Sequence, residues 1–464
     1  MNMLIVDKVY FVGIGGIGMS ALARYFHAQG KQVGGYDKTE TTLTKSLIKE
    51  GIEIHYKDDN IPAWMLEAHH EKSLVVYTPA IPESNRELQY FNQNNFHVYK
   101  RAEVLGFVTQ DTYTIAVAGT HGKTTTSTLL AHVLRSCNID CTAFLGGVSS
   151  NYNTNLLLSE KENIIVVEAD EYDRSFLKLS PDLAVITSVD PDHMDIYRDE
   201  ADLNNTFQAF AKRVKKNGVL LVNKQIDIDF EIPKNGSLFT YSADINSDFM
   251  AHHLRLKEGQ QVFDAQMLDL FTGEEYEVEA KSINLKLPGK HNVENAMASI
   301  AVAYQLGCQC EEIVEAVKSF KGVKRRFDQY QGSSSVYIDD YAHHPEEVKS
   351  TLYAVRSLYP EQKITVVFQP HLFSRTRDFA DEFARSLSLA DELILLKIYP
   401  AREEPIEGVD ADMLLNKVQL DAKSVMTKEV LLDNLKKNKR KVLVTLGAGD
   451  IDQLVEPIKS IYNK

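Results

Sequence analysis

Short apolar runs alternate with helix-like patterns over the first part of the chain. Three of these runs, Lys8–Val12, Gln32–Tyr36 and Leu74–Thr78, predict buried parallel strands, because strands covered on both faces need not alternate apolar with polar residues. A glycine-rich turn at Gly13–Gly18 follows the first run and precedes a helical stretch at Met19–Gln29. This succession of strand, turn and helix predicts an α/β domain with a parallel sheet.

Two further blocks follow. The second begins near Asp111 with an apolar strand that stops at a glycine turn, and it continues through Ile164–Ala169 and Leu183–Ser188. Residues 237–287 alternate apolar with polar positions between glycine turns, which predicts an antiparallel sheet. The third block begins near Arg326, and its predicted strands are Val336–Asp340, Ile364–Gln369, Glu392–Lys397 and Val442–Gly447. The pattern therefore predicts three α/β units in series.

Composition narrows the class of protein. A length of 464 residues suggests about three domains, each large enough to bury a core. A formal net charge of −14 argues against a general nucleic-acid-binding or membrane-surface protein. The 4 cysteines lack the spacing of zinc ligands, and the chain shows no secretory signal or long apolar segment. We therefore expect reduced thiols in a soluble, cytoplasmic protein.

The stretch Ala116–Thr126, A-V-A-G-T-H-G-K-T-T-T, places a glycine loop between an apolar strand and a predicted helix. In such a loop the backbone N–H groups and the helix N-terminus face phosphate, while Lys123 reaches the outer phosphates and Thr124 can hold Mg²⁺. The common pattern G-x-x-x-x-G-K has a glycine where this chain has Val117. In this chain the first glycine of the loop is Gly119, so the loop is shorter than the common one. We expect a chain with this loop to bind a nucleoside triphosphate and to hydrolyse or transfer its phosphate.

The turn Gly13–Gly18 reads G-I-G-G-I-G, and Asp37 closes the next strand at about the spacing of an acid that binds a ribose. Taken alone, this pattern is typical of a dinucleotide-binding enzyme. A glycine-rich turn at a helix N-terminus binds any diphosphate, however, so a UDP group fits as well as NAD. A purely structural role for the glycines is a third alternative.

Carboxylates follow the predicted strands beside the phosphate loop. The letters E-A-D-E begin at Glu168, and D-P-D-H-M-D contains His193. Because strand ends next to a phosphate loop are where nucleotide-bound metals are held, Glu168 and His193 are candidate ligands of a second Mg²⁺. For Asp170, Glu171 and Asp173 we expect only a solvated acidic turn.

Further polar motifs lie towards the C-terminus. The run L-P-G-K-H-N-V-E-N-A places Asn292 and Asn295 at a helix start, where amides suit an adenine edge but also serve as ordinary caps. In K-R-R-F-D, Arg326 either stabilises a transferring phosphoryl group or pairs with a surface carboxylate. The motifs D-D-Y-A-H-H-P and Q-P-H-L-F-S-R-T-R end successive strands, where α/β sheets bind ligands. Adjacent His343 and His344 point in different directions, so we do not expect them to share a metal ion.

In their order and spacing these motifs closely resemble those of the Mur ligase family. The resemblance covers essentially the whole chain, from G-I-G-G-I-G-M-S and G-T-H-G-K-T-T to the final G-A-G-D-I at Gly447–Ile451. The family's shortened phosphate loop accounts for Val117. The resemblance implies a Rossmann-like UDP-sugar-binding domain, a P-loop-type ATP-binding domain with a mixed sheet, and a Rossmann-like C-terminal domain that binds the amino acid and ATP. We expect these domains at residues 1–110, 111–325 and 326–464.

The resemblance also implies a reaction. L-alanine is joined to the lactyl carboxylate of UDP-N-acetylmuramate through an acyl phosphate, with ATP converted to ADP and phosphate and with Mg²⁺ as cofactor. This is a step of peptidoglycan precursor synthesis, and it makes the UDP reading of the first glycine turn preferable to NAD. We expect a cytoplasmic monomer or weak homodimer that binds neither nucleic acid nor membrane.

Three other functions compete with this one. A family member that attaches a preformed peptide to the same UDP-sugar shares many of the motifs, although residues 398–403 and the G-A-G-D-I ending favour the alanine enzyme. A nicotinamide-dependent oxidoreductase would leave the phosphate loop without a role. A non-catalytic nucleotide sensor would not require Lys123, Glu168 and His193 together.

Individual roles follow from the resemblance by position in this sequence. The residues expected at ATP are Gly119, Thr120, His121, Gly122, Lys123, Thr124, Thr125, Asn292, Asn295, Arg326 and Asp340. Those expected at the UDP-sugar are Gly15, Gly16, Ile17, Gly18 and Asp37. The expected metal ligands are Thr124, Glu168 and His193, and the expected catalytic residues are Lys123, Glu168, His193, His343 and Arg375.

The chain departs from the family pattern at one position and leaves another undecided. Leu372 stands where the family often has arginine, which leaves recognition of the alanine carboxylate to Arg375. Several relatives carry a carbamylated lysine near the metal, and Lys212 is the nearest candidate for it in this chain.

Overall fold

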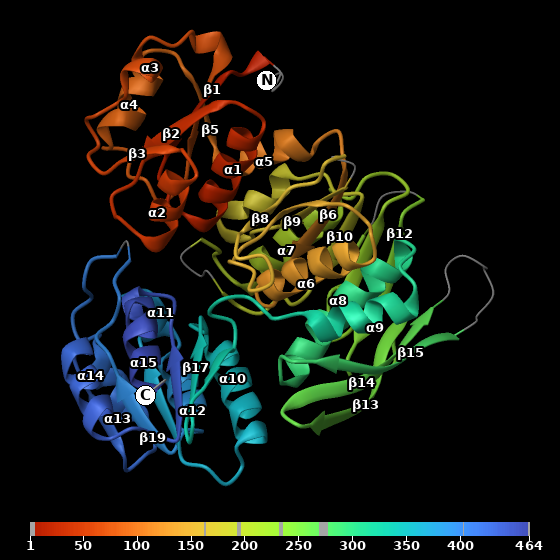
Figure 1. Ribbon diagram of the computed structural model, residues 1–464, viewed down its shortest axis with the longest axis vertical. Helices are drawn as coiled ribbons and strands as arrows, with labels where there is room; N and C mark the ends of the chain where they lie inside the picture. The colour runs from red at the N-terminus through yellow and green to blue at the C-terminus, as the bar shows by residue number, and fades with distance from the viewer. Residues whose placement is uncertain are drawn as a thin grey trace. The chain divides into compact units, whose positions relative to one another are not determined.

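The computed structural model describes residues 5–161, 164–192, 196–231, 235–268, 277–401 and 403–462. Within these residues the strands form three sheets, which confirms the predicted α/β class (Figure 1). By their internal contacts the residues fall into two compact units. The first unit consists of Met1–His252, Ala265–Lys281 and Asn295–Ser319. The second consists of His253–Asp264, Ser282–Glu294 and Phe320–Lys464.

The first sheet is wholly parallel, with the order β3-β2-β1-β4-β5. Its strands are β1 (Lys8–Val12), β2 (Gln32–Tyr36), β3 (Glu53–His55), β4 (Ser73–Tyr77) and β5 (His97–Lys100). The helices are α1 (Ile17–Ala28), α2 (Thr42–Lys49), α3 (Ala63–Leu66), α4 (Arg86–Gln93) and α5 (Arg101–Thr109). Along β1, Val9 and Phe11 pack with α1, whereas Tyr10 and Val12 pack with α3 and α4. Because helices cover both faces, the strand is apolar and buried from Val9 to Val12, and this is why it could be predicted.

The second sheet is mixed and has the order β15-β14-β13-β12-β11-β10-β6-β9-β7-β8 among the described residues. Its first strands are β6 (Tyr113–Ala118), β7 (Thr142–Phe144), β8 (Leu156–Leu157), β9 (Ile164–Glu168) and β10 (Leu183–Ile186). The others are β11 (Val219–Asn223), β12 (Ser237–Ser242), β13 (Phe249–Lys257), β14 (Gln260–Leu268) and β15 (Glu277–Leu285). The associated helices are α6 (Lys123–Ser136), the 3₁₀ helix η3 (Tyr172–Lys178), α7 (Glu200–Ala211), α8 (Lys290–Gln305) and α9 (Cys310–Ser319).

The antiparallel prediction for residues 237–287 is wrong at its first strand. β12 pairs in parallel with both β11 and β13, so it extends the parallel part of the sheet. β13 and β14 are neighbours joined by Glu258 and Gly259 alone, and so short a connection requires antiparallel strands. Alternation marks a strand with one exposed face, which occurs in both arrangements, and it therefore cannot give the direction of pairing.

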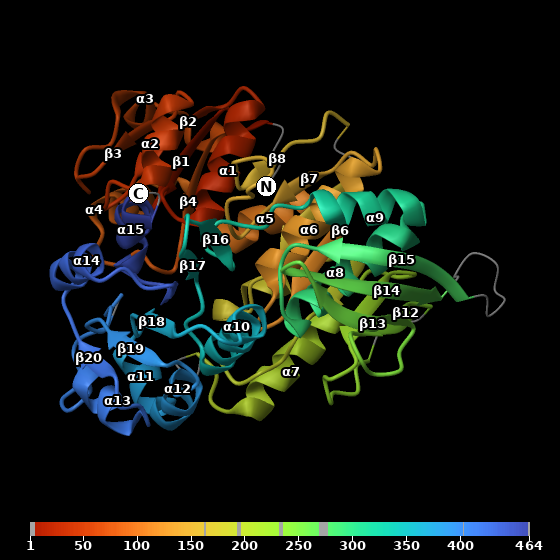
Figure 2. The same ribbon diagram turned by 60° about the horizontal axis from the view of Figure 1, so that its bottom comes forward.

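The third sheet has the order β16-β17-β21-β18-β19-β20, and β16 is antiparallel to β17. Its strands are β16 (Asp328–Gln331), β17 (Val336–Asp340), β18 (Ile364–Phe368), β19 (Glu392–Leu395), β20 (Lys423–Val425) and β21 (Val442–Leu446). The helices are α10 (Pro345–Leu358), α11 (Phe373–Asp378), α12 (Ala380–Leu387), α13 (Ala411–Lys417), α14 (Lys428–Lys437) and α15 (Val455–Tyr462). The parallel strands β18, β19 and β20 run side by side (Figure 2). The edge strands β16 and β20 were not predicted, because short edge strands lack an apolar run.

One apolar cluster joins the first two domains inside the first compact unit. It runs from β1 and α1 through β6 and β9 to α7. A separate cluster fills the C-terminal domain between its sheet and helices α14 and α15. Among the described residues, no helix is long and apolar enough to cross a membrane.

Candidate active site

The phosphate loop joins the end of β6 to the start of α6. Gly119 has a φ of +135°, and a Cβ there would lie 2.8 Å from the backbone nitrogen of Ser188. The Ser188 carbonyl accepts the Thr120 N–H at 3.0 Å, and its hydroxyl oxygen accepts the His121 N–H at 2.8 Å. Gly122, with a φ of +82°, is the N-cap of α6, and no described side chain caps this helix. The first N–H groups of α6 are therefore placed to meet an anion.

Lys123, the first residue of α6, turns back onto the loop. Its Nζ donates to the carbonyl oxygens of Gly119 at 2.5 Å and Thr120 at 3.3 Å. The same nitrogen lies 2.8 Å from a carboxylate oxygen of Glu171, whose side chain is fully buried. Burial lowers the pKa of Lys123, but Glu171 and neighbouring carboxylates outweigh this effect and raise it. The lysine therefore remains charged and is anchored to the loop.

The prediction of a solvated acidic turn after β9 is wrong for Glu171, whereas the side chains of Asp170 and Asp173 are 38% and 33% exposed. Glu171 is buried at the phosphate loop. Asp170 lies 3.3 Å from Arg101, and Asp173 lies 2.8 Å from Lys100. Lys100 ends β5 and Arg101 begins α5, so both cations come from the N-terminal domain. The turn after β9 is thus a junction between the first two domains, and its partners lie too far along the chain to be recognised from local sequence.

Glu168 is the last residue of β9, beside β6 and the phosphate loop. Gly146, which follows β7, lies directly against its carboxylate, and a Cβ at this glycine would overlap both carboxylate oxygens. The φ of Gly146 is not in the left-handed region, so the reason for glycine here is space. The absence of a side chain at this position leaves the Glu168 carboxylate in place.

The other residues predicted to bind the metal or to lie near it differ in their burial and in their partners. Thr124 is buried in the first turn of α6. His193 lies outside the described residues. Lys212 follows α7 with about half of its side chain exposed, and it pairs with Glu231 at 2.9 Å. In the part of the chain that the structure describes, no group of three or more His, Cys, Asp and Glu side chains is arranged to hold a metal.

The glycine turn of the N-terminal domain is held by the acid that was predicted to bind ribose. The Gly15 N–H donates to Asp37 Oδ2 at 2.8 Å, and the Thr39 N–H donates to Asp37 Oδ1 at 3.0 Å. Gly13 has a φ of +91°, and Gly16 is the N-cap of α1, a helix that no described side chain caps. As at α6, the helix start presents N–H groups to an anion.

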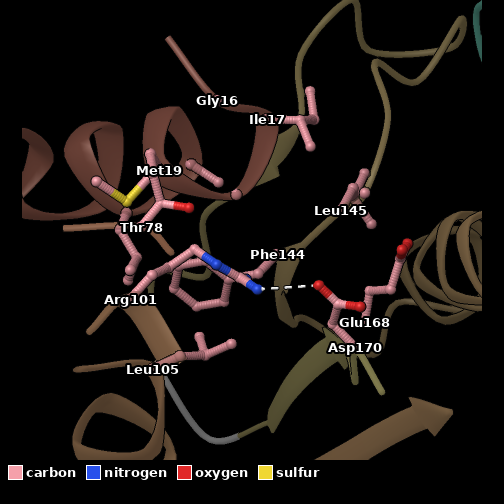
Figure 3. A pocket seen from close by; sticks show the side chains of 14 residues that line it. Gly16, Ile17, Met19, Thr78, Arg101, Leu105, Phe144, Leu145, Glu168 and Asp170 are labelled. Carbon is pink, nitrogen blue, oxygen red and sulfur yellow. Dashed lines mark hydrogen bonds and ion pairs between the residues drawn. The ribbon is translucent and has the colours of Figure 1, made fainter. Parts of the chain in front are cut away.

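A cavity of about 220 Å³ opens between this glycine turn and Glu168 (Figure 3). The start of α1, part of α5 and the turn after β7 line it, and Glu168 and Asp170 stand at one side. In the close view the Arg101 guanidinium extends towards Asp170, with Leu105 and Phe144 beside it. All of these segments belong to the first compact unit.

Helix α8 carries both predicted asparagines, in different roles. The Asn292 side chain donates to the Pro288 carbonyl at 2.7 Å and so stabilises the start of its own helix. The Asn295 side-chain oxygen accepts a hydrogen bond from the Thr126 hydroxyl at 3.2 Å. Asn295 also packs against Gly122, where a Cβ would overlap its side-chain oxygen. The fold therefore brings Asn295 to the phosphate loop.

Arg326 and Asp340 lie together in the second compact unit. Asp340 ends β17 and accepts the N–H groups of Phe327 at 2.8 Å and Ala342 at 2.7 Å. Burial raises its pKa to about 6, although the Arg326 guanidinium acts in the opposite direction. That guanidinium also lies 5.0 Å from the centre of the Tyr341 ring. The pair thus places a buried carboxylate and a partly exposed guanidinium at the carboxyl end of a parallel strand.

The two adjacent histidines face different neighbours, as expected. His343 Nδ1 lies 3.2 Å from the Glu347 carboxylate, and its ring lies 6.0 Å from that of His371. His344 is the N-cap of α10, and its ring packs edge-on against Phe379.

The segment around the missing arginine is buried. Leu372 has a φ of +70°, and its N–H donates to the Tyr399 carbonyl at 2.9 Å. An enclosed apolar side chain offers no donor to a carboxylate. Arg375, one turn later in α11, is also buried.

Sequence reasoning missed three residues that shape this site. Arg101 and Gly146 belong to none of the recognised motifs. Asn155 is buried in the central domain and donates to the Ile17 carbonyl at 2.6 Å and the Ser20 hydroxyl at 3.0 Å, which fastens α1 to this domain. No local pattern marks these residues, because each acts through a partner far away in the chain.

Comparison with known proteins places the chain among Mur ligases. The matching family models are the Mur ligase family catalytic domain over residues 8–113, the Mur ligase middle domain over 117–303, and the Mur ligase glutamate ligase domain over 325–451. A UDP-N-acetylmuramate–L-alanine ligase from Flavobacterium psychrophilum is 50% identical over 461 residues, covering 99% of both chains. The crystal structure of UDP-N-acetylmuramate–alanine ligase from Thermotoga maritima matches with a TM-score of 0.78 and 27% identity, covering 98% of this chain and 99% of that one. A murein peptide ligase from Psychrobacter arcticus, with a TM-score of 0.71 and 21% identity over 99% of both chains, shares the fold.

Proposed function

The chain belongs to the Mur ligase family, and we propose that it is the ATP-dependent ligase that joins L-alanine to the lactyl carboxylate of UDP-N-acetylmuramate in peptidoglycan synthesis. One observation carries this proposal. A single compact unit holds a glycine turn suited to a diphosphate, a phosphate loop with its lysine, and a cavity that leads from the turn to Glu168. An oxidoreductase would have no use for the phosphate loop, and a sensor would not need the cavity beside it.

The chemistry explains why ATP is needed. A carboxylate is a poor acyl donor until one of its oxygens becomes part of a good leaving group. The lactyl carboxylate oxygen attacks the γ-phosphorus of ATP, and the bond from this phosphorus to the oxygen of ADP breaks. The alanine amine then attacks the acyl carbon of the resulting acyl phosphate. The tetrahedral intermediate releases phosphate, the amine loses a proton, and an amide remains.

We assign ATP to the central domain, at residues 111–325, with its phosphates on the loop. The loop fits this ligand because α6 starts without a described side-chain cap and Gly119 leaves no room for a side chain. Lys123 would pair with the outer phosphates. The remaining residues that we assign to ATP in this domain are Thr120, His121, Gly122, Thr124, Thr125, Asn292 and Asn295.

We assign Mg²⁺ to Thr124, Glu168 and His193. Hydroxyl and carboxylate oxygens are ligands that this ion prefers, and Gly146 gives the Glu168 carboxylate its space. When bound, Mg²⁺ would neutralise charge on the reacting phosphate.

We place the UDP-sugar on the N-terminal domain, at residues 1–110. Its diphosphate would meet Gly15, Gly16, Ile17 and Gly18 at the start of α1, and Asp37 would hold this turn in shape.

The C-terminal domain, which we place at residues 326–464, would supply Arg326 and Asp340 to ATP. His343 and Arg375 would serve the amino acid. Because Leu372 is buried and apolar, the alanine carboxylate would depend on Arg375. We further propose that the enzyme works in the cytoplasm as a monomer or weak homodimer, without nucleic acid or membrane.

The proposal is tested by measuring phosphate release from ATP in the presence of UDP-N-acetylmuramate, with one amino acid or peptide supplied at a time. We expect turnover with L-alanine and none when the UDP-sugar is omitted. Turnover with a preformed tripeptide but not with L-alanine would overturn it in favour of the peptide-adding member of the family.

A further inference from the structure

We propose that Arg101 binds the carboxylate of the lactyl arm inside the cavity, and that Asp170 positions Arg101 for this task. The inference rests on the proposed function, because it assigns a residue to the acceptor carboxylate of that reaction.

Arg101 lies beside the start of α1. It begins α5, and a Cβ at Gly18 would lie 2.8 Å from Arg101 Nη1, so the guanidinium lies at the start of α1. Its Nη2 lies 3.3 Å from Asp170 Oδ2 on the other side of the cavity (Figure 3). The side chain is 20% exposed. Arg101 therefore lies between the turn suited to the diphosphate and the strand end that carries Glu168.

The donors of Arg101 suit a second partner. Among the described residues, the Arg101 side chain donates a hydrogen bond to Asp170, and this bond uses Nη2. Arginine presents five N–H donors in a flat fork, so Nε and Nη1 remain as donors for a second anionic partner such as a carboxylate. The nearby walls contributed by Leu105, Phe144 and Leu145 suit the methyl group of a lactyl arm.

A purely structural ion pair is the simpler alternative, and a neighbouring pair shows what that looks like. Lys100 and Asp173 cross the same junction at 2.8 Å with 40% of the lysine side chain exposed, and neither residue lines the cavity. Asn155 adds another link between the same domains. Arg101 differs from both in lining the cavity.

The test compares four variants of the full chain: Arg101→Ala, Arg101→Lys, Asp170→Asn and the control Lys100→Ala. Binding is measured by calorimetry with UDP-N-acetylmuramate and with UDP-N-acetylglucosamine, which lacks the lactyl arm. KM and kcat are measured for each substrate, and thermal unfolding checks the fold. We expect Arg101→Ala to weaken the binding of UDP-N-acetylmuramate about 10- to 100-fold. The binding of UDP-N-acetylglucosamine should weaken less than about twofold.

The other variants separate contact from positioning. Arg101→Lys keeps the charge but not the fork, so its binding loss should be intermediate. Asp170→Asn should raise the KM for the UDP-sugar by less than Arg101→Ala does and leave the KM for ATP unchanged. Lys100→Ala should leave the KM values for the UDP-sugar and for ATP unchanged.

Four results would overturn the inference. Equal weakening of both UDP-sugars by Arg101→Ala would assign Arg101 to the diphosphate. If Arg101→Ala loses thermal stability but binds both UDP-sugars as wild type does, Arg101 has a structural role. The same conclusion follows if Lys100→Ala weakens binding as much as Arg101→Ala does. A wild-type chain that binds neither UDP-sugar would leave Arg101 nothing to recognise. If wild type binds with the expected arm dependence but fails to turn over with L-alanine, the proposed function falls and the binding role of Arg101 stands.

Discussion

Replacing Lys123 with alanine removes the ammonium that lies 2.8 Å from the fully buried Glu171 carboxylate. At an effective dielectric constant of about 20, the attraction at this distance is about 6 kcal/mol before desolvation is counted. Removing one partner of a buried ion pair typically costs about 3–5 kcal/mol, because a charge is left in a poorly solvated place. With a shift of about 2–4 °C per kcal/mol for a domain of this size, we expect the unfolding midpoint to fall by on the order of 10 °C.

A second substitution separates this stability effect from catalysis. Glu171→Gln in the Lys123→Ala background removes the buried charge, so most of the lost stability should return while turnover stays absent. Circular dichroism melting and phosphate release are measured on wild type, both single variants and the double variant. The matched control is Lys178→Ala, which breaks an ion pair at 3.3 Å whose lysine is 53% exposed and which should cost less than about 1 kcal/mol.

Three outcomes would refute this reasoning. If Lys123→Ala melts at the wild-type temperature, or if the double variant is as unstable as Lys123→Ala, the buried pair does not have the assigned energy. If the double variant regains turnover, Lys123 is not needed at the phosphates.

Gly146→Ala should push the Glu168 carboxylate aside and lower kcat about 100-fold with little change in melting temperature; an unchanged kcat in the phosphate-release assay would contradict this. Burial raises the pKa of Glu87 to about 7 from the ordinary 4.5, so its contribution to stability is present below 4.5 and is lost as the pH rises to 7. Glu87→Gln should remove about 3 kcal/mol of this dependence, seen in urea unfolding at about pH 5 and pH 8; an identical pH slope would disprove it. Arg326→Ala should raise the pKa of Asp340 above about 6, because the guanidinium that lowers it is gone. The fall of kcat towards acid pH should then begin at a higher pH. If the pH of this fall does not change, a group other than Asp340 causes it.

Local sequence was informative wherever a feature depends on neighbouring residues. β1, β2 and β17 have the predicted bounds, because each strand contains a run of buried apolar or glycine residues. The phosphate loop was equally readable. Its two glycines, Gly119 and Gly122, both have the positive φ that a tight strand-to-helix turn requires. The order of such motifs was enough to identify the family.

Local sequence failed where a residue acts through a distant partner. The acidic turn looked solvated because nothing nearby pairs with it, yet Glu171 meets Lys123 across 48 positions and Asp170 meets Arg101 across 69. The parallel pairing of β12 was missed for a similar reason, since alternation records exposure and not direction.

By itself, then, the sequence determined the three α/β units, the two glycine-bearing turns at helix starts and the presence of Lys123 at the head of its helix. These depend on backbone conformation and on burial, and both are encoded over a few successive residues. Only the tertiary structure decided which carboxylate holds that lysine, that Gly146 makes room for Glu168, and that Arg101 lines the cavity between the first glycine turn and Glu168. The reason is physical: charge pairing and packing depend on proximity in space, which the fold creates between segments that are far apart in the chain.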